Sequence, residues 1–371
     1  TMVTAGVYLM TRVSPLLAHS SSAALVIAVI GAATAFVAAT IACAQDDIKR
    51  VLAYSTVSQL GYMFLAVGCG AYVAAIFLMV AHAFFKALLF LSAGSVIHGL
   101  DDEQDLKRMG GLRRYMPVTY GAFLVGWLAI AGVPPLAGFW AKSDILLNAY
   151  AKDPGLWVVA AATSVLTAYY MGREFFLAFY GPERWGGLRG AHPPHDPGWT
   201  MSAPVVLLAV LSVFGGFLDL PFHPHWVFLE RWLDPVVGAN LYNPRVGLGG
   251  LWALAVVDGV LALAGVYVAG WVWGRVWDRP ALEPAFLRQG WYADLAIDDV
   301  VGRPSRRLAD FASAVVELKV IDGAVNGVAE AVRAAAGSLR RVQTGYVRNY
   351  ALLITGGAVA VLAFVLARAG G

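Results

Sequence analysis

The chain has 371 residues, of which 59% are hydrophobic and 14% are charged, whereas roughly 25% of the residues of a soluble domain carry a charge. A soluble chain of this length could not bury so much apolar surface, and two cysteines are too few for a secreted disulfide scaffold. The apolar composition also excludes a disordered chain. The net charge of +3 needs no nucleic-acid partner to explain it. The composition therefore predicts a polytopic membrane protein.

Long windows without acidic or basic residues predict membrane-spanning helices, because about 20 apolar residues cross a bilayer. Barrel strands would alternate in segments of about ten residues, whereas these runs are long and continuous. A single helix over 51–98 would be about 70 Å long, so we expect a break at Gly68-Cys69-Gly70. The expected spans are 2–13, 22–44, 52–68, 72–98, 117–150, 156–180, 203–220, 249–274 and 347–367.

The Lys and Arg residues of the connections predict the orientation of the chain. Most of them lie in 45–50, 99–116, 181–198 and 275–346, which we assign to the cytoplasmic side. The prediction is a multi-pass protein of the bacterial inner (plasma) membrane, equivalent to the mitochondrial inner membrane. Cys43 and Cys69 then fall on opposite sides, so we expect two buried free thiols.

The segment 275–345 differs from the rest because charged residues alternate with apolar ones. The apolar residues recur at spacings of mostly three and four, which predicts one stripe on a helix over 305–341. Such a helix either lies on the lipid surface or packs as a strut across neighbouring subunits, and the pattern leaves both open. The stripe consists of Leu308, Phe311, Val315, Leu318, Ile321, Val325, Val328, Val332 and Leu339.

Ionisable residues inside a span are costly and therefore become candidates for function. Lys86 lies in the middle of the span 72–98, and His82 shares its helix face four residues earlier. Because histidine titrates near neutral pH, the two side chains could pass a proton between them. The alternative is a lysine held in a fixed ion pair.

A second lysine follows a predicted helix break. Pro134-Pro135 removes two N–H donors, so one half-helix should end near Ala131 and another begin near Leu136. Broken helices of this kind mark ion sites in transporters, which makes Lys142 a candidate. Asp144 is a weak partner, because residues two apart do not face each other on a helix.

Four further candidates carry weaker signals. Arg173 and Glu174 are either a buried pair or lie near the inner boundary, Asp258 stands alone in its span, and His98 closes a span. The loop histidines His192, His195, His223 and His225 do not complete a metal site. No nucleotide, haem or iron–sulfur motif is visible, so we expect no cofactor and no metal in this chain.

Several stretches together resemble a known family. They are TMVTAGVYLM, DIKRVLAYSTVSQLGYMFLA, HAFFKALLFLSAGSVIH and MGGLRR, and they are similar to the large antiporter-like membrane subunits of respiratory complex I (NADH-quinone oxidoreductase). The lateral helix and last span resemble the subunit L branch, whose mitochondrial counterpart is NADH dehydrogenase subunit 5. The chain is expected to be the C-terminal portion of such a protein.

The resemblance implies a proton-translocating role coupled to quinone reduction elsewhere in the complex. It places Lys86, with His82 beside it, on a polar axis along the middle of the membrane, Lys142 at the connection to the outer side, and His98 as an extension. Family members often carry an acid directly after the second lysine, whereas here Ser143 precedes Asp144. The family's other broken helix and its Glu–Lys pair would lie upstream of residue 1.

The same resemblance implies the surroundings of the chain. FMN, iron–sulfur clusters and quinone are expected in other subunits, and the expected partners are M-, N-, J- and K-like membrane subunits and the lipid bilayer. The predicted fold is an all-α transmembrane bundle with one discontinuous helix, a long lateral amphipathic helix and a final transmembrane anchor. Its expected parts are an antiporter-like core (1–220), a connecting loop with an additional span (221–274), the lateral region (275–345) and the anchor (346–371).

Three hypotheses follow. In the first, Lys86 and Lys142 alternate between charged and neutral as neighbouring charges move, which drives proton transfer. In the second, the chain resembles an A-like component of a multisubunit Na⁺/H⁺ antiporter. In the third, it is a membrane clamp whose lysines are inert.

Overall fold

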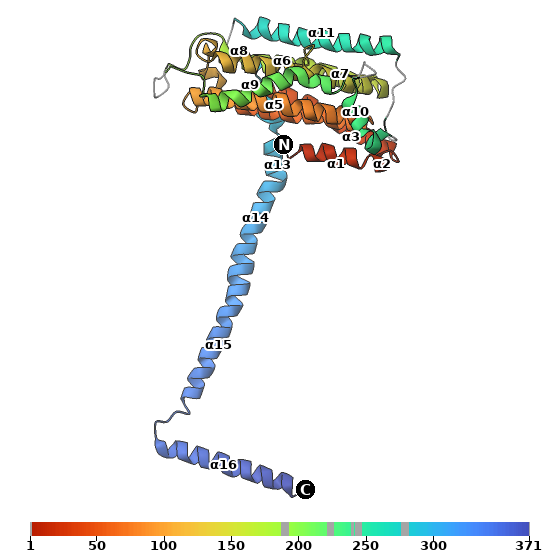
Figure 1. The fold of residues 1–371 in the computed structure, drawn as a ribbon. Helices are drawn as coiled ribbons and strands as arrows, with labels where there is room; N and C mark the ends of the chain where they lie inside the picture. Colours follow the sequence, from red (N-terminus) through yellow and green to blue (C-terminus); the bar gives the residue numbers. More distant parts are fainter. Residues whose placement is uncertain are drawn as a thin grey trace. The chain divides into compact units, whose positions relative to one another are not determined.

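The computed structural model describes residues 2–186, 193–220, 226–238, 241, 247–275 and 282–370. They divide into two compact units, Thr1–Tyr292 and Ala293–Gly371. The first unit is a bundle of helices in which α11, α8, α6 and α5 run side by side (Figure 1). Its helices are α1 (Thr4–Arg12), α2 (Ser14–Leu17), α3 (Ser21–Ala42), α4 (Ile48–Gly68), α5 (Tyr72–Gly99), α6 (Pro117–Ala131), α7 (Ala137–Lys152), α8 (Pro154–Phe179), α9 (Trp199–Phe214), α10 (Phe228–Val237), α11 (Leu248–Trp273) and α12 (Ala285–Arg288), with 3₁₀ turns η1 (Leu106–Arg108), η2 (Leu112–Arg114), η3 (Gly215–Leu218) and η6 (Gly290–Tyr292).

The predicted class of fold is confirmed. Within the described ranges, seven helices are long and apolar enough to cross a membrane, including α16 (Val347–Ala369) of the second unit. The expected break after Gly68 is present, because α4 ends there and Gly70 takes the positive φ of 81° that starts the turn into α5. Cys43 and Cys69 are both buried free thiols, as expected.

The discontinuous helix is also confirmed. The first half, α6, ends at Ala131, and Gly132 at its end has a φ of 83°, which a residue with a Cβ adopts only at a cost. The second half, α7, starts at Ala137 beyond the two prolines. Two features differ from the expectation: α10 forms a short additional helix, and 282–292 belongs to the bundle unit rather than to the lateral segment.

Small residues allow α3 and α4 to pack backbone against backbone. A Cβ on Gly61 would lie 2.5 Å from the Ala35 nitrogen, and a Cβ on Gly31 would lie 2.5 Å from the Leu65 nitrogen. In a lipid environment such close approach replaces the hydrophobic effect as the source of helix association. Close backbone contact therefore contributes to the packing of α3 against α4.

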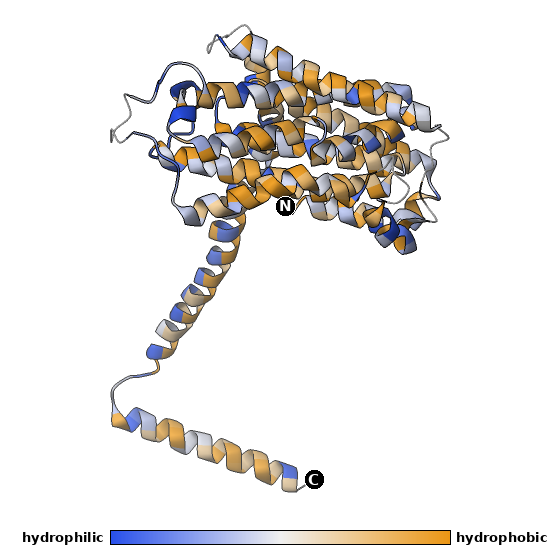
Figure 2. Cartoon of the chain, turned by 45° about the horizontal axis from the view of Figure 1, so that its top comes forward, coloured by the Kyte–Doolittle hydropathy of each residue, from blue (hydrophilic) through white to orange (hydrophobic). Residues whose placement is uncertain are grey.

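The second unit is one long helical segment followed by α16. The segment comprises α13 (Ala293–Ile297), α14 (Arg303–Phe311) and α15 (Asp322–Arg340), joined by the π-helical stretches η7 (Asp298–Gly302) and η8 (Ala312–Ile321). It begins before the predicted position 305. Polar and apolar residues alternate along it, whereas α16 is largely apolar (Figure 2). Leu308, Val325 and Leu339 of the predicted stripe are exposed, so the stripe has no cover within this unit.

We expect Gly61→Ala to destabilise the bundle by about 1–3 kcal/mol, because the added methyl group must push the α3 backbone away. The measurement is unfolding in detergent micelles. Gly94→Ala in α5 is the matched control, because a Cβ there would meet no atom within 4 Å. Equal destabilisation by both substitutions would contradict the close packing of α3 and α4.

Candidate functional site

Lys86 lies in the interior of the bundle on α5. Its side chain is 6% exposed, and its Nζ donates a hydrogen bond to Ser55 Oγ on α4. The ammonium also lies 5.2 Å from the centroid of the Phe90 ring. A cavity of about 670 Å³ opens beside Lys86 and His82 and is lined also by Thr4 and Thr56. The lysine is thus buried but borders a largely apolar cavity to which Thr4, Thr56 and His82 add polar groups.

His82 is one helical turn from Lys86 and is also buried. Its ring makes an edge contact with Phe85, with 5.5 Å between the ring centroids, and its Nε2 has no hydrogen-bond partner in the described structure. The predicted sharing of one helix face is therefore present. A buried ring nitrogen without a partner is able to receive or release a proton.

Glu174 on α8 is the acidic group that interacts electrostatically with Lys86. It is fully buried, and neither carboxylate oxygen has a hydrogen-bond partner among the described residues. A buried carboxylate without donors is expensive, so its neighbouring cation is a large part of its stabilisation. From the sequence alone Glu174 was a weaker functional candidate, because it was interpreted together with the adjacent Arg173.

Lys142 occupies the gap that the helix break creates. Its Nζ donates a 2.7 Å hydrogen bond to the carbonyl oxygen of Ile130 in the last turn of α6. In an unbroken helix this oxygen would accept from residue 134, but Pro134 has no N–H. The lysine therefore binds the acceptor that the proline leaves free. Its ammonium also lies 5.2 Å from the centroid of the Tyr62 ring.

Asp258 on α11 is the acidic group that interacts electrostatically with Lys142. The side chain is buried, and both of its oxygens are without a hydrogen-bond partner in the described part of the chain. The structure thus repeats one arrangement twice: a buried lysine interacts electrostatically with a buried acidic residue on another helix. The two pairs are Lys86 with Glu174 and Lys142 with Asp258.

One face of α4 connects the surroundings of the two lysines. Ser55, Gln59 and Tyr62 lie four and three residues apart, and all are fully buried. Ser55 binds Lys86, and the Tyr62 ring lies beside Lys142. Both amide atoms of Gln59 lack a hydrogen-bond partner in the described structure. Tyr170 on α8 is also fully buried, and its hydroxyl has no hydrogen-bond partner in the described structure.

Sequence reasoning missed these residues of α4. Serine, glutamine and tyrosine carry no charge, so they do not stand out as ionisable groups do. Their signal was the spacing of polar residues on one face of an otherwise apolar helix.

Asp144 faces away from Lys142, as its spacing predicted. It accepts a 3.1 Å hydrogen bond from Asn148 Nδ2, and its acidic neighbours are Asp219 and Glu230. Asp219 follows η3 and is buried, with Oδ1 unpartnered within the described residues. Acidic groups from three parts of the chain therefore interact near the middle of α7.

The interpretation of Arg173 and Glu174 as a mutual pair is wrong. Arg173 is fully buried and binds Glu283 through Nε and Nη2, with the Nε distance at 3.1 Å, and it binds Asp46 at 2.8 Å. Lys107 contacts Glu283 at 2.6 Å, and Arg288 contacts it at 3.0 Å. This cluster of five residues, called here the inner ion cluster, joins α8 and two loops to the segment that leads into the second unit.

The remaining histidine candidates lie apart from the lysines. His98 is exposed at the end of α5, with its ring 6.5 Å from the ring of His195. It is separated from Lys86 by about three turns of helix. His192, His223 and His225 lie outside the described residues. No group of three metal-ligating side chains occurs in the part of the chain that the structure describes.

A bundle with a broken helix and buried lysines facing carboxylates is typical of the membrane subunits of ion transporters. Residues 1–167 match the family described as NADH:quinone oxidoreductase/Mrp antiporter, transmembrane. NADH-quinone oxidoreductase subunit L of Mycobacterium tuberculosis is 42% identical over 380 residues, which cover 99% of this chain and 58% of that protein. Over nearly all of its length the chain is thus similar to antiporter-like membrane subunits, and the predicted resemblance is confirmed.

Two further comparisons agree. NAD(P)H-quinone oxidoreductase chain 5 of Picosynechococcus is 39% identical over 399 residues, which cover 99% of this chain and 59% of that protein. The chain therefore spans less than two thirds of the length of these relatives. The solved structure of the Mrp complex from Dietzia sp. DQ12-45-1b matches 98% of this chain and 36% of that chain with a TM-score of 0.57 at 24% identity. At this identity the match shows a shared fold.

We expect Glu283→Gln to lower the free energy of unfolding by about 3–5 kcal/mol, because it leaves buried Arg173 without its main counter-charge. Unfolding in detergent micelles measures the change. Asp299→Asn is the control: its pair with Arg303 at 2.7 Å is exposed and should be worth less than about 1 kcal/mol. A small effect of Glu283→Gln would contradict the structural weight given to the inner ion cluster.

The same carboxylate should make stability depend on pH. Burial alone would raise the pKa of Glu283, but the neighbouring Arg173 and Lys107 outweigh burial, so the pKa lies below the usual glutamate range. A lowered pKa means that the stabilisation is present above about pH 4.3, the ordinary glutamate value, and is lost as the pH falls through the folded-state pKa. The difference in stability between the wild type and Glu283→Gln should therefore shrink on acidification. A constant difference would contradict this assignment.

Proposed function

We propose that the chain is part of a proton-translocating membrane subunit of an NADH:quinone oxidoreductase in the bacterial inner membrane. Quinone reduction by other subunits, which carry FMN and iron–sulfur clusters, would supply the free energy. The observation that carries the proposal is the repeated pairing of a buried lysine with a buried carboxylate, linked by the polar face of α4.

Electrostatic switching of Lys86 is the first step of the proposed mechanism. Two opposite unit charges about 7 Å apart at an effective dielectric constant of about 20 attract by about 2.4 kcal/mol. When Glu174 is protonated or moves away, the ammonium of Lys86 loses this stabilisation in an interior where charge is costly. It then releases its proton to the free ring nitrogen of His82 or to water in the adjoining cavity.

Transfer between the lysines would follow α4. Hydroxyl groups at Ser55 and Tyr62 both donate and accept protons, and the unsatisfied amide of Gln59 between them is a place where buried water binds. Tyr62 donates a 2.6 Å hydrogen bond to the Ala160 carbonyl oxygen, which fixes its ring beside Lys142. Water between these groups would complete a chain of proton acceptors.

Lys142 would release the proton towards the outer side. Its ammonium is stabilised by Asp258 and by the Ile130 carbonyl oxygen, so loss of either interaction favours the neutral amine. Asp144, Asp219 and Glu230 line the way from α7 to that side as proton acceptors. His98, at the end of α5, lies outside this path, and its role stays a prediction.

The second unit would hold the protein against its neighbours in the complex. The exposed apolar stripe of α14 and α15 fits either lipid or the M-, N-, J- and K-like subunits expected as partners. The inner ion cluster fixes the segment that precedes it, through Glu283 and Arg288. A clamp role for this unit is compatible with proton transfer in the first.

We expect Lys86→Ala and Lys142→Ala each to reduce the number of protons pumped per electron in membranes that contain the complete complex. Each variant removes a site where charge can alternate. Lys86→Arg should fail to restore pumping, because the guanidinium keeps its proton. Proton uptake and quinone reduction are measured together, with the exposed Lys49→Ala as the control.

Wild-type stoichiometry in both alanine variants would refute the proposal. If removal of residues 293–371 then prevented assembly, the chain would be a structural clamp with inert lysines. Restoration of pumping by Lys86→Arg would show that a fixed positive charge suffices, which the switching mechanism does not allow.

A second candidate function follows from the family match, whose description includes the Mrp antiporter. In a stand-alone cation/proton antiporter, a sodium gradient would produce a pH gradient in vesicles without any electron donor. A pH gradient that requires NADH and quinone favours the first function.

A further inference from the structure

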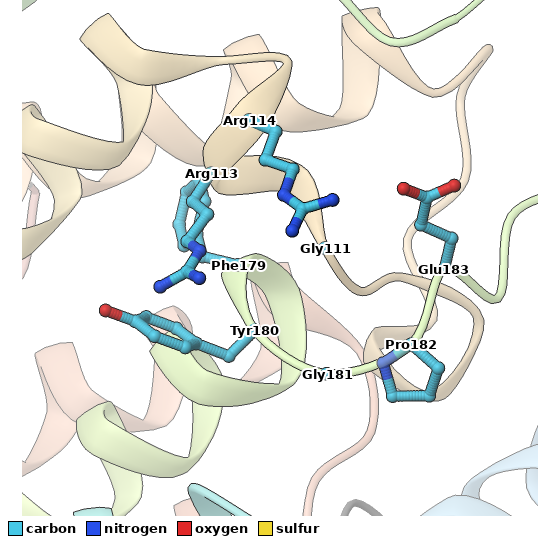
Figure 3. A pocket seen from close by; sticks show the side chains of 8 residues that line it. All are labelled: Gly111, Arg113, Arg114, Phe179, Tyr180, Gly181, Pro182 and Glu183. Carbon is cyan, nitrogen blue, oxygen red and sulfur yellow. The ribbon is translucent and has the colours of Figure 1, made fainter.

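The motif MGGLRR forms a cavity that proton transfer does not use. The cavity has a volume of about 390 Å³ and lies between η2 and the end of α8 (Figure 3). In Figure 3 Arg113 lies beside the Tyr180 ring at one side of the cavity and Glu183 at the other, and the Arg114 guanidinium points towards the space between them. This position is at the Lys- and Arg-rich side of the bundle.

The cavity is built by loops that are firmly joined. Arg184 donates hydrogen bonds to the carbonyl oxygens of Lys107 at 2.7 Å and Leu177 at 2.9 Å. Trp185 Nε1 donates to the Gly110 carbonyl oxygen at 3.1 Å. A Cβ on Gly110 would lie 2.2 Å from the Pro182 carbonyl oxygen, and Gly110 has a φ of 129°. Only glycine allows the two loops to close on each other here.

Arg113 and Arg114 at the cavity do not contribute ion pairs to the stability of the described fold. Neither forms an ion pair with a described residue, and both side chains are exposed. The Arg113 guanidinium stacks over the Tyr180 ring at 4.7 Å, which orients it without neutralising it. The nearest carboxylate, Glu183, accepts a 3.0 Å hydrogen bond from the Tyr115 hydroxyl. Two guanidinium groups that form no ion pair with a described residue are suited to a phosphate, which arginine binds with two parallel hydrogen bonds.

The surroundings indicate where this phosphate comes from. The cavity lies where α8 ends and α6 begins, and tyrosine and tryptophan gather around it: Tyr115 contacts Trp185 at 5.4 Å, and the Tyr120 hydroxyl lies 2.9 Å from the Tyr180 hydroxyl. Such residues are enriched at the level of lipid headgroups. Basic cavities between membrane helices on the cytoplasmic side bind anionic lipid headgroups.

We propose that Arg113 and Arg114 bind the phosphate of an anionic phospholipid headgroup from the cytoplasmic leaflet. The site is independent of the proposed proton path, since its lining residues are not among those that contact Lys86 or Lys142 in the described structure. Glu183 at the opposite side limits the affinity through repulsion.

The test is photo-crosslinking with phosphatidylglycerol in vesicles that contain the complete complex with the full-length protein. The labelled peptides are those that span 110–116 and 177–186. The half-saturating lipid fraction should rise about fivefold for each arginine replaced by alanine, which corresponds to roughly 1 kcal/mol. Glu183→Gln should lower the half-saturating lipid fraction, because this variant removes the carboxylate and keeps both arginines.

Arg108→Ala is the matched control. Arg108 lies on the same connection and is exposed, but it already pairs with Glu103 at 3.4 Å and with Asp105 at 3.8 Å. Unchanged lipid labelling in the Arg113→Ala/Arg114→Ala variant would overturn the proposal. So would a loss of labelling in Arg108→Ala as large as the loss in that double variant. Displacement of the lipid label by excess inorganic phosphate would show that the site takes a soluble anion and would also overturn it. Persistence of the label in phosphate supports the lipid.

Discussion

The cost of burying charge is the constraint on which this structure depends. Lysine and carboxylate side chains lie inside an apolar helical bundle, where an isolated ion would be intolerable. The fold meets this constraint by placing each lysine near one carboxylate from a different helix. Because the compensation is incomplete, as the unpartnered oxygens of Glu174 and Asp258 show, the protonation of each pair is sensitive to its surroundings. The inner ion cluster is the opposite case, in which three cations and two acids are fully engaged.

Backbone geometry positions several of the polar and charged groups in this structure. Pro134 frees the Ile130 carbonyl oxygen, and Lys142 binds it, so the helix break and the lysine are one device. Gly61 and Gly31 bring α3 and α4 into backbone contact, which positions the polar face of α4 against α5 and α8. Gly110 does the same for the loops that hold Arg113 and Arg114. In each case a proline, which lacks a backbone N–H, or a glycine, which lacks a side chain, determines the position of a polar or charged group.

The sequence predicted the helices, the break at the two prolines, and Lys86, His82 and Lys142 as ionisable groups inside spans. These predictions were possible because apolar length and an isolated charge are local signals. The partners of these residues did not. Glu174 and Arg173 are adjacent in the chain, so a sequence pattern suggests a pair, yet their side chains leave α8 in different directions and meet groups more than 80 residues away. Asp258 and Glu283 likewise depend on tertiary packing. The proton-relay roles assigned to Lys86, His82, Lys142, Asp144 and His98 stay predictions.

The adjacency of Arg173 and Glu174 has a mechanical consequence. Consecutive Cα atoms are about 3.8 Å apart, so both side chains belong to the same turn of α8. Arg173 is bound to Asp46 and Glu283, and Glu174 interacts electrostatically with Lys86. A displacement of the Arg173 side chain would therefore also shift Glu174 relative to its lysine. The electrostatic interaction in the interior of the bundle would then depend on contacts made at its edge.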